Sequence, residues 1–124
     1  MDDLTDLNDS NASISIFKDI VRKFVNNRNW AQYHTPKNLV QAINCEAGEL
    51  SQLLLFKDYK KEDIWDNKSL MVNISDEIAD VFIYLISLVN LLNLDLSQAF
   101  ITKMNKNKKK YDIHEFNNGL YYKK

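Results

Sequence analysis

Four carboxylic acids recur in this sequence as two pairs of the same spacing. Glu46 and Glu49 form the first pair, and Glu77 and Asp80 form the second, each three residues apart. On a helix this spacing projects both side chains to one side. Both pairs lie in mainly apolar stretches, where a carboxylate is costly to bury unless a cation meets it. We therefore predict that the two pairs face each other and hold a divalent metal ion.

The donor set decides which metal is expected. Carboxylate oxygens are hard ligands of the kind that Mg²⁺ and Mn²⁺ accept. Such a metal can also contact phosphate oxygens and activate water. A di-iron bundle would need Glu-x-x-His pairs, and His34 and His114 lie outside both acid stretches. The alternative is that the two pairs are ordinary solvated helix surface.

The second acid pair opens the most apolar segment of the chain, residues 76–92. Tyr84 and Ser87 continue Glu77 and Asp80 at spacings of three and four, which places one narrow polar line on an otherwise apolar helix. A helix that is apolar on most sides is buried. A single subunit of four helices cannot cover all of this surface, which favours an oligomer.

Three further segments have helical periodicity, and the breaker content supports an all-α fold. Only two glycines and one proline occur in 124 residues, of which 45% are hydrophobic. Long helices with few tight turns are therefore expected. The predicted helices and their caps are 14–29 after Ser13, 36–56 after Thr35, and about 96–110 after Asp95. A charged connection at 57–68 has room for a short helical turn.

This gives one domain of four main helices, with a flexible acidic leader at 1–12, the helical domain at 13–111 and a tail at 112–124. The net charge of −1 gives no electrostatic footprint for nucleic acid. The single Cys45 excludes an internal disulfide. The apolar run at 81–92 is too short to cross a membrane, and no secretory leader is visible. A cytoplasmic protein without nucleic-acid or membrane partners is expected.

Two polar or aromatic groups supplement the acids. Lysines recur on the last predicted helix and can form a basic stripe for phosphate, or a solvated helix end that suits the dipole. Its members are Lys103, Lys106, Asn107, Lys110 and Tyr111. Aromatic side chains before and after the second helix can stack on a nucleobase, or can be hydrophobic plugs between helices. They are Trp30, Tyr33 and Phe56, with His34 beside them.

Together these motifs resemble the all-α nucleoside triphosphate pyrophosphohydrolases. The order E-x-x-E, spacer, E-x-x-D is similar to the superfamily signature, and it occurs here with W-x-x-Y-H-x-P-x-N-L at 30–39 and K-M-x-K-N-x-x-K-Y at 103–111. The likeness covers 24–111 and is strongest to the MazG-like dCTP pyrophosphatase branch. Phe56 stands where that branch often has tryptophan, and Asp112 where proline is common.

The resemblance implies a four-helix MazG-like bundle completed by oligomerisation, as a homodimer or homotetramer. It implies Mg²⁺-dependent cleavage between the α and β phosphates, which gives a nucleoside monophosphate and pyrophosphate. The metal ligands would be Glu46, Glu49, Glu77 and Asp80, with water as the nucleophile. Substrate contacts would fall on Trp30, His34, Asn38, Phe56, Tyr84, Lys103, Asn107, Lys110 and Tyr111.

Three functional hypotheses remain at this point. The first is a house-cleaning nucleotide pyrophosphatase that acts on dCTP or related dNTPs. The second is a phosphoribosyl-ATP or dUTP specialist of the same superfamily. The third is a non-catalytic helical interaction module whose acids are only surface or interface charge. Stabilisation by Mg²⁺ and nucleotide distinguishes the third from the others, because a ligand that binds the native state raises its apparent stability.

Overall fold

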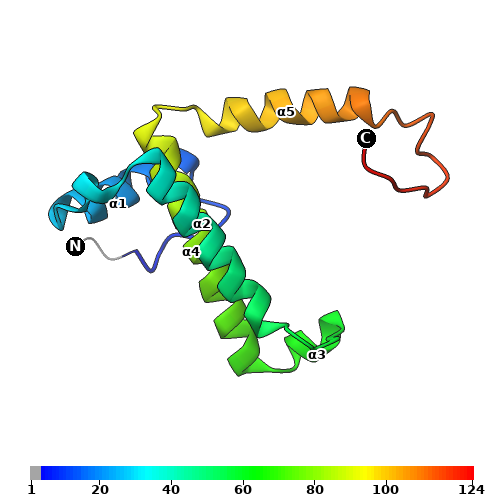
Figure 1. Cartoon of the computed structure of the whole chain (residues 1–124), viewed down its shortest axis with the longest axis horizontal. Coiled ribbons are helices and arrows are strands. Elements are labelled where there is room, and N and C mark those ends of the chain that lie inside the picture. Colours follow the sequence, from blue (N-terminus) through cyan, green and yellow to red (C-terminus); the bar gives the residue numbers. More distant parts are fainter. Residues whose placement is uncertain (1–3) are drawn as a thin grey trace. The chain divides into compact units, whose positions relative to one another are not determined.

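The computed structural model describes residues 4–124. The described chain divides into two compact units, the first ending at Asn93 and the second spanning 94–124. All regular structure in these residues is helical (Figure 1). The all-α fold class predicted from the sequence is therefore confirmed.

The first helix, α1 (Ile14–Asn27), begins where its sequence offers a cap. The Ser13 side chain accepts a hydrogen bond from the Ile16 backbone N–H at 3.2 Å, which satisfies a donor left open at the helix start. The helix ends two residues before the predicted position 29. Asn29 adopts a left-handed φ of 54°, which asparagine tolerates, and the chain enters the short 3₁₀ helix η1 (Trp30–Tyr33).

The second long helix, α2 (Pro36–Leu53), starts as predicted and ends earlier. Thr35 caps it by accepting from the Asn38 N–H at 3.2 Å, and proline occupies the first helical position. The sequence predicts an end at 56, but the last turn tightens into bonds between residues three apart. Phe56 then takes a left-handed φ of 57° and is 97% exposed.

The charged connection contains the predicted short helix, α3 (Lys61–Trp65). It leads into α4 (Lys68–Leu91), the longest helix of the chain. Asn67 caps α4 by accepting from the Leu70 N–H at 3.0 Å. The sequence pattern predicts a start near Ser69, and the helix begins one residue earlier.

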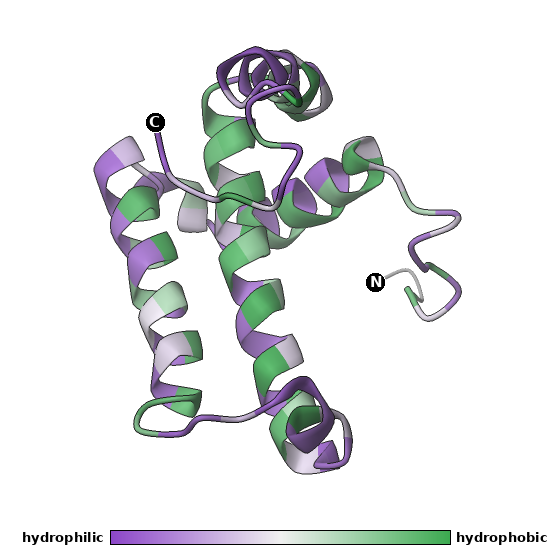
Figure 2. Cartoon of the chain, turned by 90° about the vertical axis from the view of Figure 1, so that its right-hand side faces the viewer, coloured by the Kyte–Doolittle hydropathy of each residue, from purple (hydrophilic) through white to green (hydrophobic). Residues whose placement is uncertain are grey.

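Helices α2 and α4 lie side by side and run in opposite directions (Figures 1 and 2), while α1 packs against α4. The rings of Phe17 and Phe82 meet edge to face at 5.7 Å across the α1–α4 contact, a favourable aromatic geometry. The buried apolar side chains of the unit are Val21, Leu39, Ile86 and Val89. This antiparallel pair brings the two acid stretches to the same level.

The segment before α1 forms hydrogen-bonded turns from residue 4 onward. The Asn8 backbone N–H donates to the Asn11 side chain at 2.7 Å, and Asn11 donates to the Asp6 carbonyl at 2.8 Å. Asp2 and Asp3 of the predicted leader lie outside the described residues. The flexibility expected of residues 1–12 stays a prediction.

The second unit consists of α5 (Leu96–Lys110) and the residues that follow it. Asp95 caps α5 as predicted, accepting from the Gln98 N–H at 2.8 Å. The tail folds back, so that the Lys124 backbone N–H donates to the Tyr111 hydroxyl at 3.1 Å. Phe116 packs between the rings of Tyr111 and Tyr122. The tail at 112–124 is thus ordered by aromatic contacts.

Among the described residues, no single helix combines the length and apolar character needed to span a membrane. Helices α4 and α5 meet those requirements only when they are taken together across the break at 92–95.

Candidate functional site

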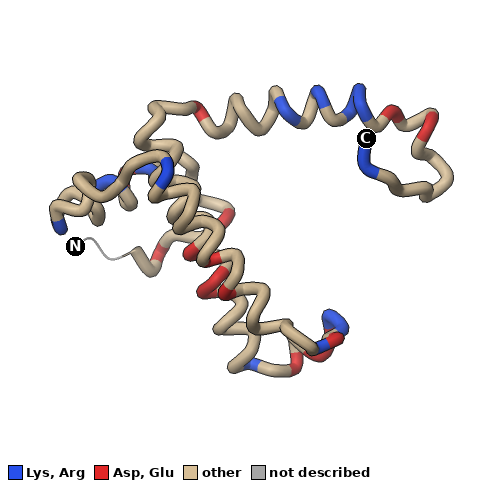
Figure 3. The backbone as a smooth tube through the Cα atoms, in the orientation of Figure 1, with Lys and Arg blue, Asp and Glu red and all other residues tan. Residues whose placement is uncertain are grey.

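The acid pairs of α2 and α4 converge midway along the two helices, where Figure 3 shows the acidic positions gathered. One oxygen from each of Glu46, Glu77 and Asp80 can be chosen so that all three lie within 4.8 Å of one another. All three residues are partly buried. The fourth acid, Glu49, is more exposed and lies at the edge of this group. We call these four side chains the acid cluster.

Burial and mutual repulsion shift the protonation of the acid cluster. Burial, as the largest cause, and the neighbouring Glu49 carboxylate together raise the pKa of Glu46 to about 7. The pKa of Glu77 is raised for the same reasons. Because a nearby negative charge disfavours ionisation, part of the cluster holds protons near neutral pH when no cation is bound.

Two oxygens of the acid cluster are buried without a partner. The Oε2 atoms of Glu46 and Glu77 have no hydrogen-bond partner among the described residues. A buried polar atom without a partner is costly, and a carboxylate more so. A divalent cation would satisfy both oxygens and relieve the repulsion, and a cluster of carboxylates is the donor set that hard cations prefer. The residues present therefore fit a divalent metal ion.

A cavity of about 350 Å³ opens beside the acid cluster, between α1, η1, α2 and α4. Glu46 and Asp80 form its acidic end, and most of its remaining lining is apolar or aromatic. Of the residues predicted to contact substrate, the cavity brings together Trp30, His34 and Tyr84. A cation site joined to an aromatic cavity suits a ligand with a charged end and a flat, less polar end.

The aromatic wall of this cavity is fixed by contacts at the end of α1. The rings of Phe24 and Trp30 meet edge to face at 5.7 Å. The Arg28 guanidinium lies over the Phe24 ring, 3.7 Å from its centroid, a favourable cation–π geometry. Arg28 also donates a hydrogen bond to the Phe24 carbonyl at 3.0 Å. The short η1 helix thereby holds Trp30 against the cavity.

Two predicted contact residues of the first unit lie away from the cavity lining. The Asn38 amide donates to the Tyr33 carbonyl at 3.0 Å, so it ties η1 to the start of α2. Phe56 lies past the end of α2 and is almost fully exposed. Neither residue is among those that line the cavity, and their substrate contacts stay predictions.

The basic positions belong to the second unit. Lys103, Asn107 and Lys110 follow one another along α5 at spacings of four and three, which places them on one face. Tyr111 ends the helix, and the Lys110 ammonium lies 5.6 Å from the centroid of its ring. Whether this face takes part in the site stays a prediction.

Sequence reasoning missed most of the contribution of α1 to the cavity. Ile20, Val21, Phe24 and Val25 all line it, but their spacing indicated only a packed apolar face. Ile83 of α4 also lines the cavity, and it was missed because its apolar position likewise indicated only packing. Ser87, by contrast, extends the polar line of α4 and lines the cavity. The polar line of α4 was therefore the sequence feature that could have indicated this cavity.

Comparison with known proteins gives several relatives. The chain is 36% identical over 94 residues to mouse (Mus musculus) dCTP pyrophosphatase 1, a match that covers 74% of this chain and 55% of the relative. It is 33% identical over the same length to the human (Homo sapiens) protein of that name. The chain thus spans about half the length of the curated relatives it matches. No protein-family model matches it.

A solved structure is also similar over nearly its whole length. It is a pyrophosphatase from Archaeoglobus fulgidus, 32% identical in sequence, with a TM-score of 0.73. The match covers 86% of this chain and 98% of the archaeal one. At this identity and coverage the likeness extends beyond the fold to the family.

Proposed function

This chain belongs to the all-α nucleoside triphosphate pyrophosphohydrolases, in the MazG-like dCTP pyrophosphatase branch, and we propose that it hydrolyses nucleoside triphosphates between the α and β phosphates. The products are a nucleoside monophosphate and pyrophosphate. We further propose deoxynucleotides as substrates, dCTP or a close relative first, because the similar curated proteins carry that name. Mg²⁺ is the proposed cofactor, and Mn²⁺ would suit the same ligands.

One observation supports this proposal most directly. The acid cluster holds two buried, unpartnered carboxylate oxygens, one of Glu46 and one of Glu77, and Glu46 with Asp80 forms one end of an aromatic cavity. An interaction module with solvated acids would not need to bury them, since exposed carboxylates cost little. A triphosphate and its cation would occupy the acidic end, while the base and sugar would fill the aromatic part.

The proposed roles follow from position. Glu46, Glu77 and Asp80 would hold the cation, with Glu49 completing the set from the edge. When bound, a divalent cation neutralises phosphate charge and lowers the pKa of a bound water. Glu49, the most exposed of the four acids, is placed to orient the attacking water by accepting its hydrogen bond. Trp30 offers a flat apolar face on which a base can stack.

We also propose that the protein works as an assembly of identical copies, a dimer or tetramer. Apolar side chains on α4 remain exposed in the single chain, among them Val72, Ile78 and Leu85 at 57%, 54% and 40%. Exposed apolar surface on this scale marks an interaction face. The expected cytoplasmic location stays a prediction.

The decisive experiment is a pyrophosphate-release assay. The protein is incubated with Mg²⁺ and each of dCTP, dUTP, dTTP, dATP, dGTP and phosphoribosyl-ATP, and pyrophosphate and inorganic phosphate are measured separately. Pyrophosphate with the matching monophosphate is expected, fastest from dCTP. Release of inorganic phosphate alone would contradict α–β cleavage. A strong preference for dUTP or phosphoribosyl-ATP would favour those specialised activities instead.

A thermal melt provides the independent control. Mg²⁺ with a nucleotide is expected to raise the melting temperature, since both bind the native state. The variant Asp76→Asn, next to Glu77 but on an exposed position of α4, is expected to keep this shift. A melting temperature that neither Mg²⁺ nor any of the nucleotides changes would favour the non-catalytic interaction module.

A further inference from the structure

The cavity beside the acid cluster has walls that belong to different helices. Val21 and Phe24 of α1 line one side, and Tyr84 and Ser87 of α4 line another. Trp30 follows α1 in the chain and contacts Phe24, so the aromatic wall depends on where α1 lies. The acids themselves are carried by α2 and α4. The spacing between α1 and α4 therefore sets the width of the aromatic part of the cavity, while the acid cluster does not depend on α1.

Apolar packing alone leaves this spacing loosely determined. Phe17 and Phe82 meet across the contact, but a further cavity of about 200 Å³, lined only by apolar side chains, lies between the same two helices. Apolar attraction has no preferred direction, and a contact with such a volume unfilled falls short of the close packing that fixes an element in one position. A directional interaction is therefore needed to hold α1 in place.

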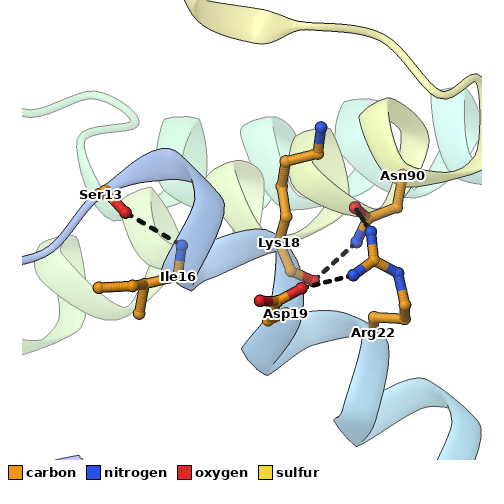
Figure 4. A network of polar contacts seen from close by, with 6 residues as sticks. All are labelled: Ser13, Ile16, Lys18, Asp19, Arg22 and Asn90. Atoms are coloured by element: carbon orange, nitrogen blue, oxygen red, sulfur yellow. Dashed lines mark hydrogen bonds and ion pairs between the residues drawn. The ribbon is translucent and has the colours of Figure 1, made fainter.

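The side chain of Asn90, near the end of α4, supplies such an interaction. This partly buried amide donates from Nδ2 to the Lys18 carbonyl at 3.0 Å, and its Oδ1 accepts from Arg22 at 3.1 Å (Figure 4). Turning the amide over would place donor against donor and acceptor against acceptor, so both partners require the same orientation. Because Lys18 and Arg22 lie about one turn apart on α1, the amide holds the helix at two points and opposes both sliding and rotation.

Arg22 is itself directed towards Asn90. Its Nη1 donates to the Asp19 carboxylate at 2.6 Å, while its Nη2 donates to Asn90. Both members of this ion pair are about half exposed, so the pair adds little stability by itself, but it limits the directions that the guanidinium can take. Arg22 and Asn90 do not line the cavity at the acid cluster, so any effect on a ligand there passes through the position of α1.

We propose that Asn90 is a positioning residue for the pyrophosphohydrolase reaction, an inference that rests on the proposed function. By holding α1 at Lys18 and Arg22, it keeps the aromatic part of the cavity at the width that fits the nucleoside of the substrate. The residue touches neither the cation site nor the reacting phosphates. Its contribution is therefore to substrate binding and not to the chemical step.

The first test is a separation of KM from kcat. Asn90→Leu removes both hydrogen bonds and keeps a side chain of similar size, so α1 is expected to visit positions that do not bind nucleotide. Because only the competent fraction binds, KM for dCTP should rise about three- to tenfold. Saturating nucleotide selects the competent position, so kcat should stay close to the wild-type value. The matched control is Asn73→Leu, the same change at an exposed position of α4 that lines none of these cavities, and both constants should be unchanged in it.

A second variant distinguishes positioning from direct contact, because Arg22 and Asn90 also line a neighbouring cavity of about 240 Å³. Arg22→Met removes one of the two bonds and should raise KM by a smaller factor. Added to Asn90→Leu, it should raise KM no further, since both changes act through one contact. A further rise in the double variant would show that Arg22 contacts the ligand and would overturn the inference. A fall in kcat at unchanged KM, as expected from general destabilisation, would overturn it too.

Amide hydrogen exchange without nucleotide tests the hold on α1 independently of the proposed function. Asn90→Leu should exchange faster than the wild type in α1 and equally in α2, whereas Asn73→Leu should match the wild type in both. Unchanged exchange in α1 would overturn the inference even if dCTP is cleaved.

A wild type that releases no pyrophosphate would contradict the proposed function on its own. Calorimetric binding of dCMP would then still decide the inference, because it needs no turnover. Weaker binding by Asn90→Leu than by Asn73→Leu supports the positioning role, and equal or absent binding overturns it.

Discussion

At the scale of single residues, the four carboxylates of the acid cluster are costly to bury and lie close to one another. Burial and repulsion act on the same carboxylates, and both effects are relieved when a cation binds. Stability and activity should therefore respond in opposite directions when one acid is neutralised. This opposition distinguishes a metal site from a group of surface charges.

The first prediction concerns neutral replacements in the acid cluster. Glu49→Gln and Asp80→Asn are each expected to abolish pyrophosphate release, because each removes a charged ligand or the group that orients water. The metal-free variants should be at least as stable as the wild type, since repulsion falls. Assays of pyrophosphate release with urea unfolding curves check both parts, and near-normal rates in either variant would contradict the metal site.

The second prediction concerns pH. The folded-state pKa of Glu46 is about 7, above its ordinary value of 4.5, so the folded protein binds more protons than the unfolded chain between these values. The Glu46 contribution to stability is therefore complete below about 4.5 and is lost as the pH rises through 7. Metal-free protein should lose stability across this window, and Mg²⁺ should remove the loss.

Urea unfolding at several pH values, with EDTA or with Mg²⁺, measures this effect. Comparison with Glu46→Gln isolates the contribution of this one carboxyl from the other titrating groups. A metal-free wild type whose stability rises from pH 5 to 8 relative to Glu46→Gln would show that the sign is wrong.

At the scale of elements, local chemistry allowed most helix starts to be predicted. Ser13, Thr35 and Asp95 were expected as caps, and each accepts a backbone hydrogen bond at the start of its helix. A cap is decided by a few neighbouring residues, so the sequence contains the required information. Helix ends were less predictable. Helices α1 and α2 stop before the predicted residues, at turns whose left-handed residues are not glycine.

The candidate site was predictable only in part, for a related reason. The acid positions follow from spacing within a helix, which is a local property. The contribution of Phe24 depends on how α1 crosses α4, and a residue on an apolar face gives no separate signal of that crossing.

The third prediction tests the cap of α2, the helix that carries the first acid pair. Thr35→Ala removes the hydroxyl that accepts from the Asn38 N–H, and it should lower the free energy of unfolding by about 1 kcal/mol. Thr35→Ser keeps the hydroxyl and should lie close to the wild type. Urea unfolding of the three proteins provides the measurement, and equal stability of the alanine and serine variants would contradict the role of the cap.

At the scale of the whole molecule, the chain buries few large side chains for its length. In the described residues only Leu39 and Ile86 are almost completely buried, and a long series of apolar side chains stays exposed. A single chain with so small a core would be marginal. The surface composition agrees with the expectation, formed from the apolar 76–92 segment, that the fold is completed by further copies.

The fourth prediction follows for the assembly. Leu85→Arg places a charge on the exposed apolar face of α4 and should shift the protein towards monomer and lower its melting temperature. Ser69→Arg, an exposed polar position on the same helix, is the matched control and should leave both unchanged. Sedimentation velocity over a range of concentrations decides the matter: a wild type that is monomeric throughout would contradict the assembly.

Phe56 has a consequence for any attempt to engineer this protein. Its left-handed backbone costs about 1–2 kcal/mol for a residue with a side chain, and its ring gains no burial in return. Phe56→Gly should therefore melt no lower than the wild type, which differential scanning calorimetry can check, and a lower melting temperature would mean that the ring is covered in solution. Selection for thermal stability alone would therefore tend to replace this phenylalanine. A screen for more stable variants should also measure the catalytic rate, because a gain in stability can come with a loss of turnover.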